Sequence, residues 1–187
     1  MKKFVFLLEE QSMKEVLSVI LPKLIPDTFM FQCVYHNGKS ALRRSIPIKT
    51  KGWLEPDVQF VIVQDKDSAD CKKLKDEIYD LVDISRRTTT LIRIVCTELE
   101  SWFLGDLDAI EKSFNVNLSA YKTKTRFLNP DNISNAKQTL KKLVPVYQQI
   151  SGSTAIAQYM DVTKNKSHSF NVFVRGVEKL VQGTRDG

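Results

Sequence analysis

Short apolar runs alternate with segments of helical periodicity in the N-terminal part of the chain, and this alternation most constrains the fold. The run Val58–Val63 is almost wholly apolar and rich in β-branched residues, as expected of a strand buried on both faces of a sheet. Similar runs at Lys3–Leu8, Phe29–Tyr35 and Thr90–Cys96 predict three more strands. Because helical segments separate the runs, we expect an α/β domain with a mostly parallel sheet.

Helices are expected after each strand, and most begin at a residue whose side chain can cap the first turn. The expected N-caps are Ser12, Asp67 or Ser68, and Thr97. Ser12 and Thr97 are each followed three residues later by a glutamate, Glu15 and Glu100, which is the spacing of a capping box.

Proline and polar residues predict where the second of these helices ends. We expect a short helix over Ala41–Ile46 that ends at Pro47, because proline disrupts a helix interior. The polar segment Lys49–Pro56 is then predicted to be a loop.

The pattern changes after residue 115, which predicts an α/β core over 1–115 and a basic helical extension, packed on the core, over 116–187. Helices are expected in the extension at Ala136–Tyr147, Ser151–Met160 and Ser167–Leu180. The net charge of +6 lies wholly in residues 107–187, which carry 12 Lys and Arg against 6 Asp and Glu. Such a region attracts polyphosphates, although an ordinary solvated surface has the same composition.

Several protein classes are excluded by composition. No apolar run reaches the roughly 18 residues of a membrane span. The N-terminal apolar stretch is short and ends in carboxylates, so we interpret it as a strand rather than a signal peptide. The three cysteines form no CxxC pair, which argues against a structural zinc site or a disulfide framework and favours a cytoplasmic location.

Acidic residues follow three of the four predicted strands. They are Glu9 and Glu10, Asp65 and Asp67, and Glu98 and Glu100. Parallel strands bring their carboxyl ends to one edge of a sheet, so these side chains are expected to converge. Clustered carboxylates repel one another, and a hard cation such as Mg²⁺ or Mn²⁺ relieves the repulsion.

The sequence therefore predicts a metal centre with Glu9, Asp65, Asp67 and Glu98 as catalytic residues and metal ligands, and with Glu100 as a further ligand. On a helix over 97–105, Glu98 and Glu100 would point in directions about 200° apart, whereas an extended segment would turn both to one face. We prefer Glu98. Helix capping is the competing explanation for Asp67 and Glu100.

Basic and histidine side chains are the candidates for binding nucleic-acid phosphates. They are His36, Lys39, Lys122, Lys124, Arg126, Lys164, Lys166 and His168. His36 and Lys39 also fit an ordinary polar turn, and His168 also fits a helix start. The chain has no GxxxxGK[ST] loop, so it is not itself a P-loop ATPase.

Two of these motifs resemble a known domain. Glu9 after the first strand and the Asp65-Lys66-Asp67 motif after the third are similar to the Toprim domain of topoisomerases, primases, recombination proteins and OLD nucleases. The resemblance implies a mostly parallel Toprim-like sheet flanked by helices, with a helical C-terminal extension. It also implies that Glu9 is a general acid/base or metal ligand, and that the two aspartates hold Mg²⁺.

A closer resemblance covers nearly the whole chain. The segments that carry it are 6–13, 36–39, 65–71, 93–106 and 167–170. They resemble an uncharacterised bacterial Toprim-like family. Members of such families often lie beside ABC-type ATPase genes in phage-defence pairs, so the resemblance implies a partner ATPase.

Three functions remain open from the sequence. The first is a Mg²⁺-dependent nuclease or phosphotransferase acting on DNA or RNA. The second is a non-catalytic scaffold that binds and regulates an ATPase, which Glu10 favours because Toprim domains usually have Gly at that position. The third is a small-molecule phosphate hydrolase, against which the basic C-terminal part argues.

Overall fold

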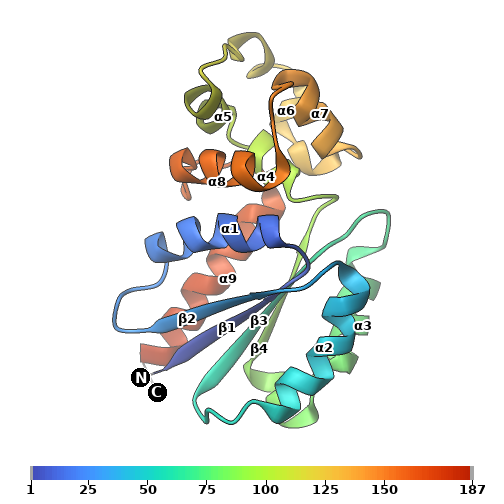
Figure 1. Ribbon diagram of the computed structural model, residues 1–187, viewed down its shortest axis with the longest axis vertical. Coiled ribbons are helices and arrows are strands. Elements are labelled where there is room, and N and C mark those ends of the chain that lie inside the picture. Colours follow the sequence, from blue (N-terminus) through green and yellow to red (C-terminus); the bar gives the residue numbers. More distant parts are fainter. Residues whose placement is uncertain (1, 186–187) are drawn as a thin grey trace.

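A four-stranded parallel sheet forms the centre of the computed structural model, which describes residues 2–185 (Figure 1). The strands are β1 (Lys3–Leu8), β2 (Met30–Tyr35), β3 (Val58–Asp65) and β4 (Thr90–Val95), and they lie in the order β2-β1-β3-β4. The central strands β1 and β3 are almost completely buried, which explains their apolar sequences. The expected α/β class and parallel sheet are confirmed.

Helices cover both faces of the sheet. Helices α1 (Gln11–Ile20) and α9 (His168–Arg185) pack on one face, and α2 (Lys39–Gly52) and α3 (Cys71–Leu81) pack on the other (Figure 1). Alternate side chains of β1 enter the two cores, because successive residues of a strand point to opposite faces.

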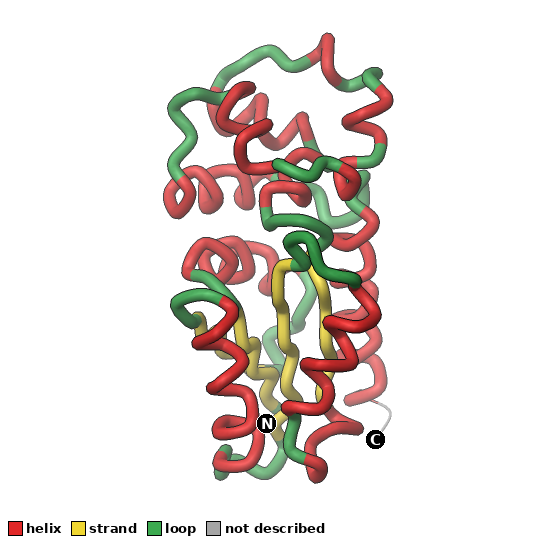
Figure 2. Tube along the Cα trace, turned by 90° about the vertical axis from the view of Figure 1, so that its right-hand side faces the viewer, coloured by secondary structure: helices red, strands yellow, loops and turns green. Residues whose placement is uncertain are grey.

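A further group of helices lies beyond the carboxyl ends of the strands (Figure 2). They are α4 (Glu100–Leu104), α5 (Leu107–Phe114), α6 (Thr125–Leu128), α7 (Ala136–Leu143) and α8 (Gln149–Tyr159). Short 3₁₀ turns are η1 (Leu21–Lys23), η2 (Ile84–Thr89), η3 (Ser119–Tyr121) and η4 (Pro130–Asn132). Helix α8 packs on α1 and α5, and α9 returns along the sheet beside β4. No helix in residues 2–185 has the length and apolarity needed to cross a membrane.

The expected capping boxes at Ser12 and Thr97 are wrong. Helix α1 has Glu10 at its N-cap without a side-chain cap, and the buried Ser12 hydroxyl donates to Glu10 instead. Thr97 has a positive φ of 61° and lies three positions before the first residue of α4, with its hydroxyl bonded to Ser101 Oγ and Ile133 O. A left-handed residue cannot serve as the extended N-cap that the box requires.

The end of α2 and the start of α3 also differ from expectation. Helix α2 continues through Pro47 to Gly52, so residues 49–52 are helical rather than loop. Its buried side is spaced by four residues, at Leu42, Ile46 and Thr50, and packing of this side on the sheet outweighs the proline. Helix α3 is capped by Asp70, whose Oδ1 accepts from Lys73 N at 2.9 Å, and not by Asp67 or Ser68.

Gly105 connects α4 and α5 where the chain leading to α9 passes close by. A Cβ at this position would overlap Asn165 Oδ1 and lie 2.7 Å from the backbone nitrogen of Ser167. The buried Asn165 side chain cannot move away cheaply, because its amide donates to Trp102 O and its oxygen accepts from Ser167 N, both at 2.8 Å.

We therefore expect Gly105→Ala to lower the free energy of unfolding by about 1–3 kcal/mol, which is typical of overpacking. Urea denaturation followed by circular dichroism measures this change. Gly52→Ala is the matched control, because no atom lies within 4 Å of its Cβ position at the end of α2. Equal effects of the two substitutions would contradict the close packing at Gly105.

Candidate functional site

The carboxyl ends of β1 and β3 form the point at which the strand order reverses. The chain leaves β1 for β2 on one side, and β3 lies on the other side of β1. In open α/β sheets, the crevice at such a switch point is where ligands bind. Glu9 follows β1 directly, and Asp65 is the last residue of β3, so both predicted ligands lie at this position.

Glu9 and Asp65 are joined through the backbone. Glu9 Oε2 accepts a hydrogen bond from Asp65 N at 3.2 Å, and Asp65 Oδ2 accepts one from Leu99 N at 3.3 Å. In the part of the chain that the structure describes, Glu9 Oε1 and Asp65 Oδ1 form no hydrogen bond with protein. Each carboxylate therefore keeps one oxygen for another ligand.

A small cavity of about 10 Å³ separates the acidic side chains. Its lining includes Glu9, Glu10, Ser12 and Asp65. This volume is close to that of one water-sized sphere, so the cavity has room for a single water or a small ion. Glu10 is held at its edge, since its Oε2 accepts from Gln149 Nε2 at 2.6 Å and from Ser12 Oγ at 3.3 Å.

Burial and mutual repulsion make these carboxylates unusually basic. Burial raises the pKa of Asp65 well above its ordinary value, and the charges of Glu9, Glu10 and Glu100 raise it further. Burial also raises the pKa of Glu9, with Asp67 and Glu10 adding to the effect and the bond from Asp65 N opposing it. A cation between Glu9 and Asp65 would relieve this repulsion.

Glu98 and Glu100 are directed at other protein groups. Glu98 Oε2 accepts from Lys137 N at 2.9 Å, at the N-terminal end of α7. The buried Glu100 Oε1 accepts from Tyr147 Oη at 3.1 Å, and burial raises the pKa of Glu100. The segment around them is neither a continuous helix nor extended. Both residues have structural partners, and their metal-binding role stays a prediction.

Asp67 and the end of β2 lie on the exposed side of the same edge. Lys39 Nζ forms an ion pair with Asp67 Oδ2 at 2.9 Å, which partly neutralises this carboxylate. His36 Nδ1 lies 2.8 Å from Leu8 O, so the ring helps to join β2 to β1. Burial lowers the pKa of His36, which favours the neutral imidazole.

Among residues 2–185, no three His, Cys, Asp or Glu side chains come close enough to ligate one metal ion together. A cage made only of protein ligands, as zinc or calcium sites often use, therefore does not fit. Mg²⁺ differs because it commonly takes one or two carboxylates and fills its remaining positions with water and phosphate oxygens. The free oxygens of Glu9 and Asp65 fit that requirement.

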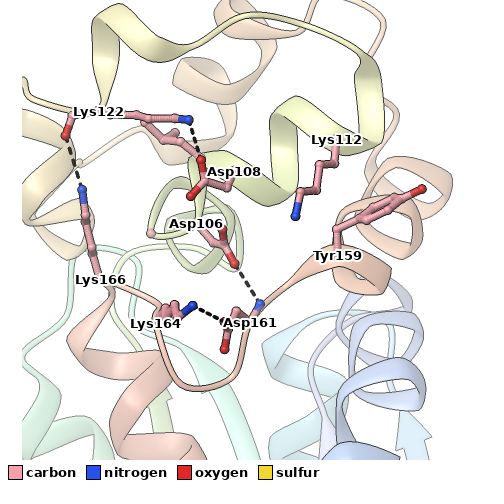
Figure 3. A pocket seen from close by; sticks show the side chains of 10 residues that line it. Asp106, Asp108, Lys112, Lys122, Tyr159, Asp161, Lys164 and Lys166 are labelled. Carbon is pink, nitrogen blue, oxygen red and sulfur yellow. Dashed lines mark hydrogen bonds and ion pairs between the residues drawn. The ribbon is translucent and has the colours of Figure 1, made fainter.

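The C-terminal basic candidates divide into two groups. Lys122, Lys164 and Lys166 line one pocket of about 200 Å³ together with Lys112, Asp106, Asp108 and Asp161 (Figure 3). Lys122 pairs with Asp108 and Glu111, and Lys164 pairs with Asp161 at 3.6 Å. These aspartates offset much of the positive charge in the pocket.

The remaining candidates lie outside this pocket. Lys124 Nζ is 4.5 Å from the centre of the Tyr121 ring, and Arg126 donates to Thr139 Oγ1 at 2.7 Å. His168 is the exposed first residue of α9. The structure therefore does not gather all the basic candidates on one surface patch, and their contact with nucleic acid stays a prediction.

A wider polar cavity of about 600 Å³ opens beside the acidic edge. It is lined by Lys66, Asp67, Ser68, Thr97, Glu98, Asp131, Asn132 and Ser134. The loops after β3 and β4 form one wall, and η4 with the residues that follow it forms the other. The cavity is large enough for a nucleotide-sized group beside the carboxylates.

Several residues of the site carry no recognisable signal in the sequence. Gln149 reaches Glu10 across 139 positions of the chain, and Tyr147 reaches Glu100 across 47. Neither belongs to a motif, because only the folding of α8 over α1 brings them to the sheet edge.

The fold and the site together define a parallel α/β protein with paired carboxylates at its switch point. A model of one protein family, described as a domain of unknown function (DUF4276), matches residues 8–178, and the chain belongs to this family. No curated protein and no solved structure matches the chain. The matched range contains every candidate residue from Glu9 to His168.

The raised pKa of Asp65 predicts a pH-dependent stability. The folded state binds the Asp65 proton more tightly than the unfolded state does. The contribution of this group to the free energy of unfolding is therefore fully present below the ordinary carboxyl pKa and is lost as the pH rises through the raised pKa. We expect Asp65→Asn to raise the free energy of unfolding at pH 7 and to have little effect near pH 3. A rise of one unit in the pKa of Asp65 corresponds to about 1.4 kcal/mol in the free energy of unfolding.

Denaturant titrations between pH 3 and 8, without divalent cations, measure this difference. Asparagine keeps an oxygen that can accept from Leu99 N, so the local geometry is retained. Asp76→Asn, on the exposed side of α3, is the control for removing one negative charge. An Asp65→Asn protein that is less stable than wild type at pH 7 would show that Asp65 is not a source of repulsion.

Proposed function

We propose that the chain is a Mg²⁺-dependent enzyme that cleaves or transfers phosphodiester groups of nucleic acid, with a Toprim-like centre built on Glu9 and Asp65. The observation that carries the proposal is the meeting of these two carboxylates at the switch point, where each has an oxygen that accepts from no protein group in residues 2–185. Two carboxylates with room for water and phosphate oxygens suit Mg²⁺.

Each residue of the edge has a role in this proposal. Asp65 and Glu9 would hold the cation, which when bound supplies charge stabilisation to a phosphate and makes a water more acidic. The raised pKa of Glu9 also favours its holding a proton that it could pass to a reacting group. Lys39, beside Asp67, can contact a phosphate oxygen at the mouth of the site.

The wider cavity is the position for the substrate. Lys66 and the hydroxyl and amide groups of its walls would contact a nucleotide placed beside Asp67. The lysine pocket at α5 would contact a phosphate further along the strand. A partner ATPase and a role in phage defence belong to the same proposal and depend on the family resemblance alone.

A non-catalytic scaffold is the second candidate, and a specific observation favours it. Asp67 is paired with Lys39, and Glu98 and Glu100 accept from donors in the C-terminal part of the chain, whereas Glu9 and Asp65 are the members of the predicted centre that line the small cavity in the described chain. In this alternative the acidic edge would be a structural network, and the chain would act by binding another protein.

Cation binding distinguishes the two candidates. We expect Mn²⁺ to bind the wild-type protein in calorimetric titrations, and Asp65→Asn and Glu9→Gln each to lower the affinity about tenfold or more, since even residues behind metal ligands contribute about this much. Glu98→Gln is the matched control, because glutamine can still accept from Lys137 N. Its affinity should equal that of the wild type.

Absence of any Mn²⁺ binding to the wild type would favour the scaffold. Binding that Glu98→Gln abolishes, but Asp65→Asn does not, would move the metal to the other end of the acidic edge.

Activity is tested on plasmid DNA and on single-stranded RNA, each with Mg²⁺ or Mn²⁺. We expect cleavage by the wild type and a loss of at least about 100-fold in Asp65→Asn, as for removal of a group that stabilises transition-state charge. Residual cleavage of equal rate in both proteins would identify a contaminating nuclease and remove the catalytic assignment.

A further inference from the structure

Two of the three cysteines lie on neighbouring elements beside the candidate site. Cys71 is the first residue of α3, and Cys96 directly follows β4. Helix α3 packs against β4, on the face of the sheet opposite α1. Both cysteines are free and half-buried.

Backbone hydrogen bonds hold the two segments in register. Lys66 N donates to Val95 O at 2.8 Å, and Asp67 N donates to Thr97 O at 3.0 Å. The chain from Asp65 to Cys71 is thereby fixed along the end of β4, and the turn Ala69 N to Lys66 O brings it back toward α3. The position of each cysteine is therefore set by ordered backbone on both sides.

Cys71 lies close enough to Cys96 to affect the pKa of its thiol. Burial is the largest cause that raises the pKa of Cys96 to about 11. The charge of Asp131 comes next, followed by the charge of Cys71 and a side-chain hydrogen bond with Cys71. Cys33 provides the contrast. It lies on β2, and burial raises its pKa to about 12, with Lys14 and Glu15 as the charged groups that affect it.

We infer that Cys71 and Cys96 are a redox-sensitive pair that forms an intramolecular disulfide on exposure to a peroxide, and that the bond fastens the start of α3 to the end of β4. The inference stands on two half-buried thiols, one at the start of α3 and one at the end of β4, on elements that pack together and whose connecting backbone is held in register. The bond itself does not depend on the proposed function, although its regulatory meaning does.

The chemistry balances with hydrogen peroxide as the oxidant. The Cys71 thiolate attacks one peroxide oxygen, the O–O bond breaks, and the products are a sulfenic acid and hydroxide. The Cys96 sulfur then attacks the Cys71 sulfur, the S–O bond breaks, and water leaves with the thiol proton. Two thiols lose two electrons and two protons in total, and one peroxide becomes two waters. The same bond forms, with the same products, when the two cysteines exchange roles.

The disulfide would act on the edge where the proposed centre lies. The loop between β3 and Cys71 contains Asp67, and the segment after Cys96 contains Glu98, and both line the wider cavity. A covalent link between the two segments would restrict their opening toward a substrate. Oxidation would therefore lower substrate access without removing a carboxylate.

Mass spectrometry of the full-length protein tests the pair. We expect hydrogen peroxide at pH 8 to remove about 2 Da, as two hydrogens are lost, and peptide mapping to recover one link, Cys71 to Cys96, which dithiothreitol reverses. Cys71→Ser and Cys96→Ser should each abolish the link, and Cys33→Ser should leave it unchanged. Wild-type protein unfolded in urea is the reference, in which all three cysteines should pair without preference.

Thermal unfolding and a variant of the proposed metal centre complete the test. The folded wild type should show a higher midpoint of thermal unfolding when oxidised, and the Cys96→Ser protein should show none of this rise. Recovery of no Cys71–Cys96 peptide, or of links to Cys33 in equal yield, would overturn the inference. Asp65→Asn should form the same disulfide as the wild type, so a failure of the metal proposal would leave this result intact.

Discussion

The parallel pairing of β1 with β3 is the constraint on which the rest of the site depends. Their register places Leu8 opposite Val63, so Glu9, one residue after Leu8, and Asp65, two residues after Val63, lie at the same end of the sheet. The pairing buries both strands and so brings two charged groups into a partly dry environment. The stability of the sheet and the repulsion within the site therefore come from the same arrangement.

The C-terminal helices supply hydrogen-bond donors to the other carboxylates of the acidic edge. Gln149 on α8 donates to Glu10, Tyr147 donates to Glu100, and the start of α7 donates to Glu98. Each donor comes from beyond the sheet, so the acidic edge is completed only when these helices pack over it. Within residues 2–185, Glu9 accepts a hydrogen bond from the end of β3, and Asp65 accepts one from the segment that precedes α4.

The strands and the order of the elements could be predicted because hydrophobic periodicity and composition are properties of short stretches of the sequence. Val58–Val63 is apolar on both faces, and β3 indeed lies at the centre of the sheet. Helix boundaries were less predictable, since Pro47 is tolerated where packing holds the rest of α2, and Asp70 caps α3 although Asp67 and Ser68 were equally suitable by residue type. The convergence of Glu9 with Asp65 followed from topology, whereas the directions of Glu98 and Glu100 did not.

The sequence by itself determined that the chain forms a parallel α/β sheet and that carboxylates follow its strands at one edge. Only the tertiary structure decided which protein donor each carboxylate meets, because the partners lie as far as 139 positions away in the chain. It also decided that Cys71 and Cys96 lie together. The physical reason is that the two-residue periodicity of a strand is a property of neighbouring residues. The hydrogen bonding of a polar side chain instead depends on donors that come near it only after long-range packing.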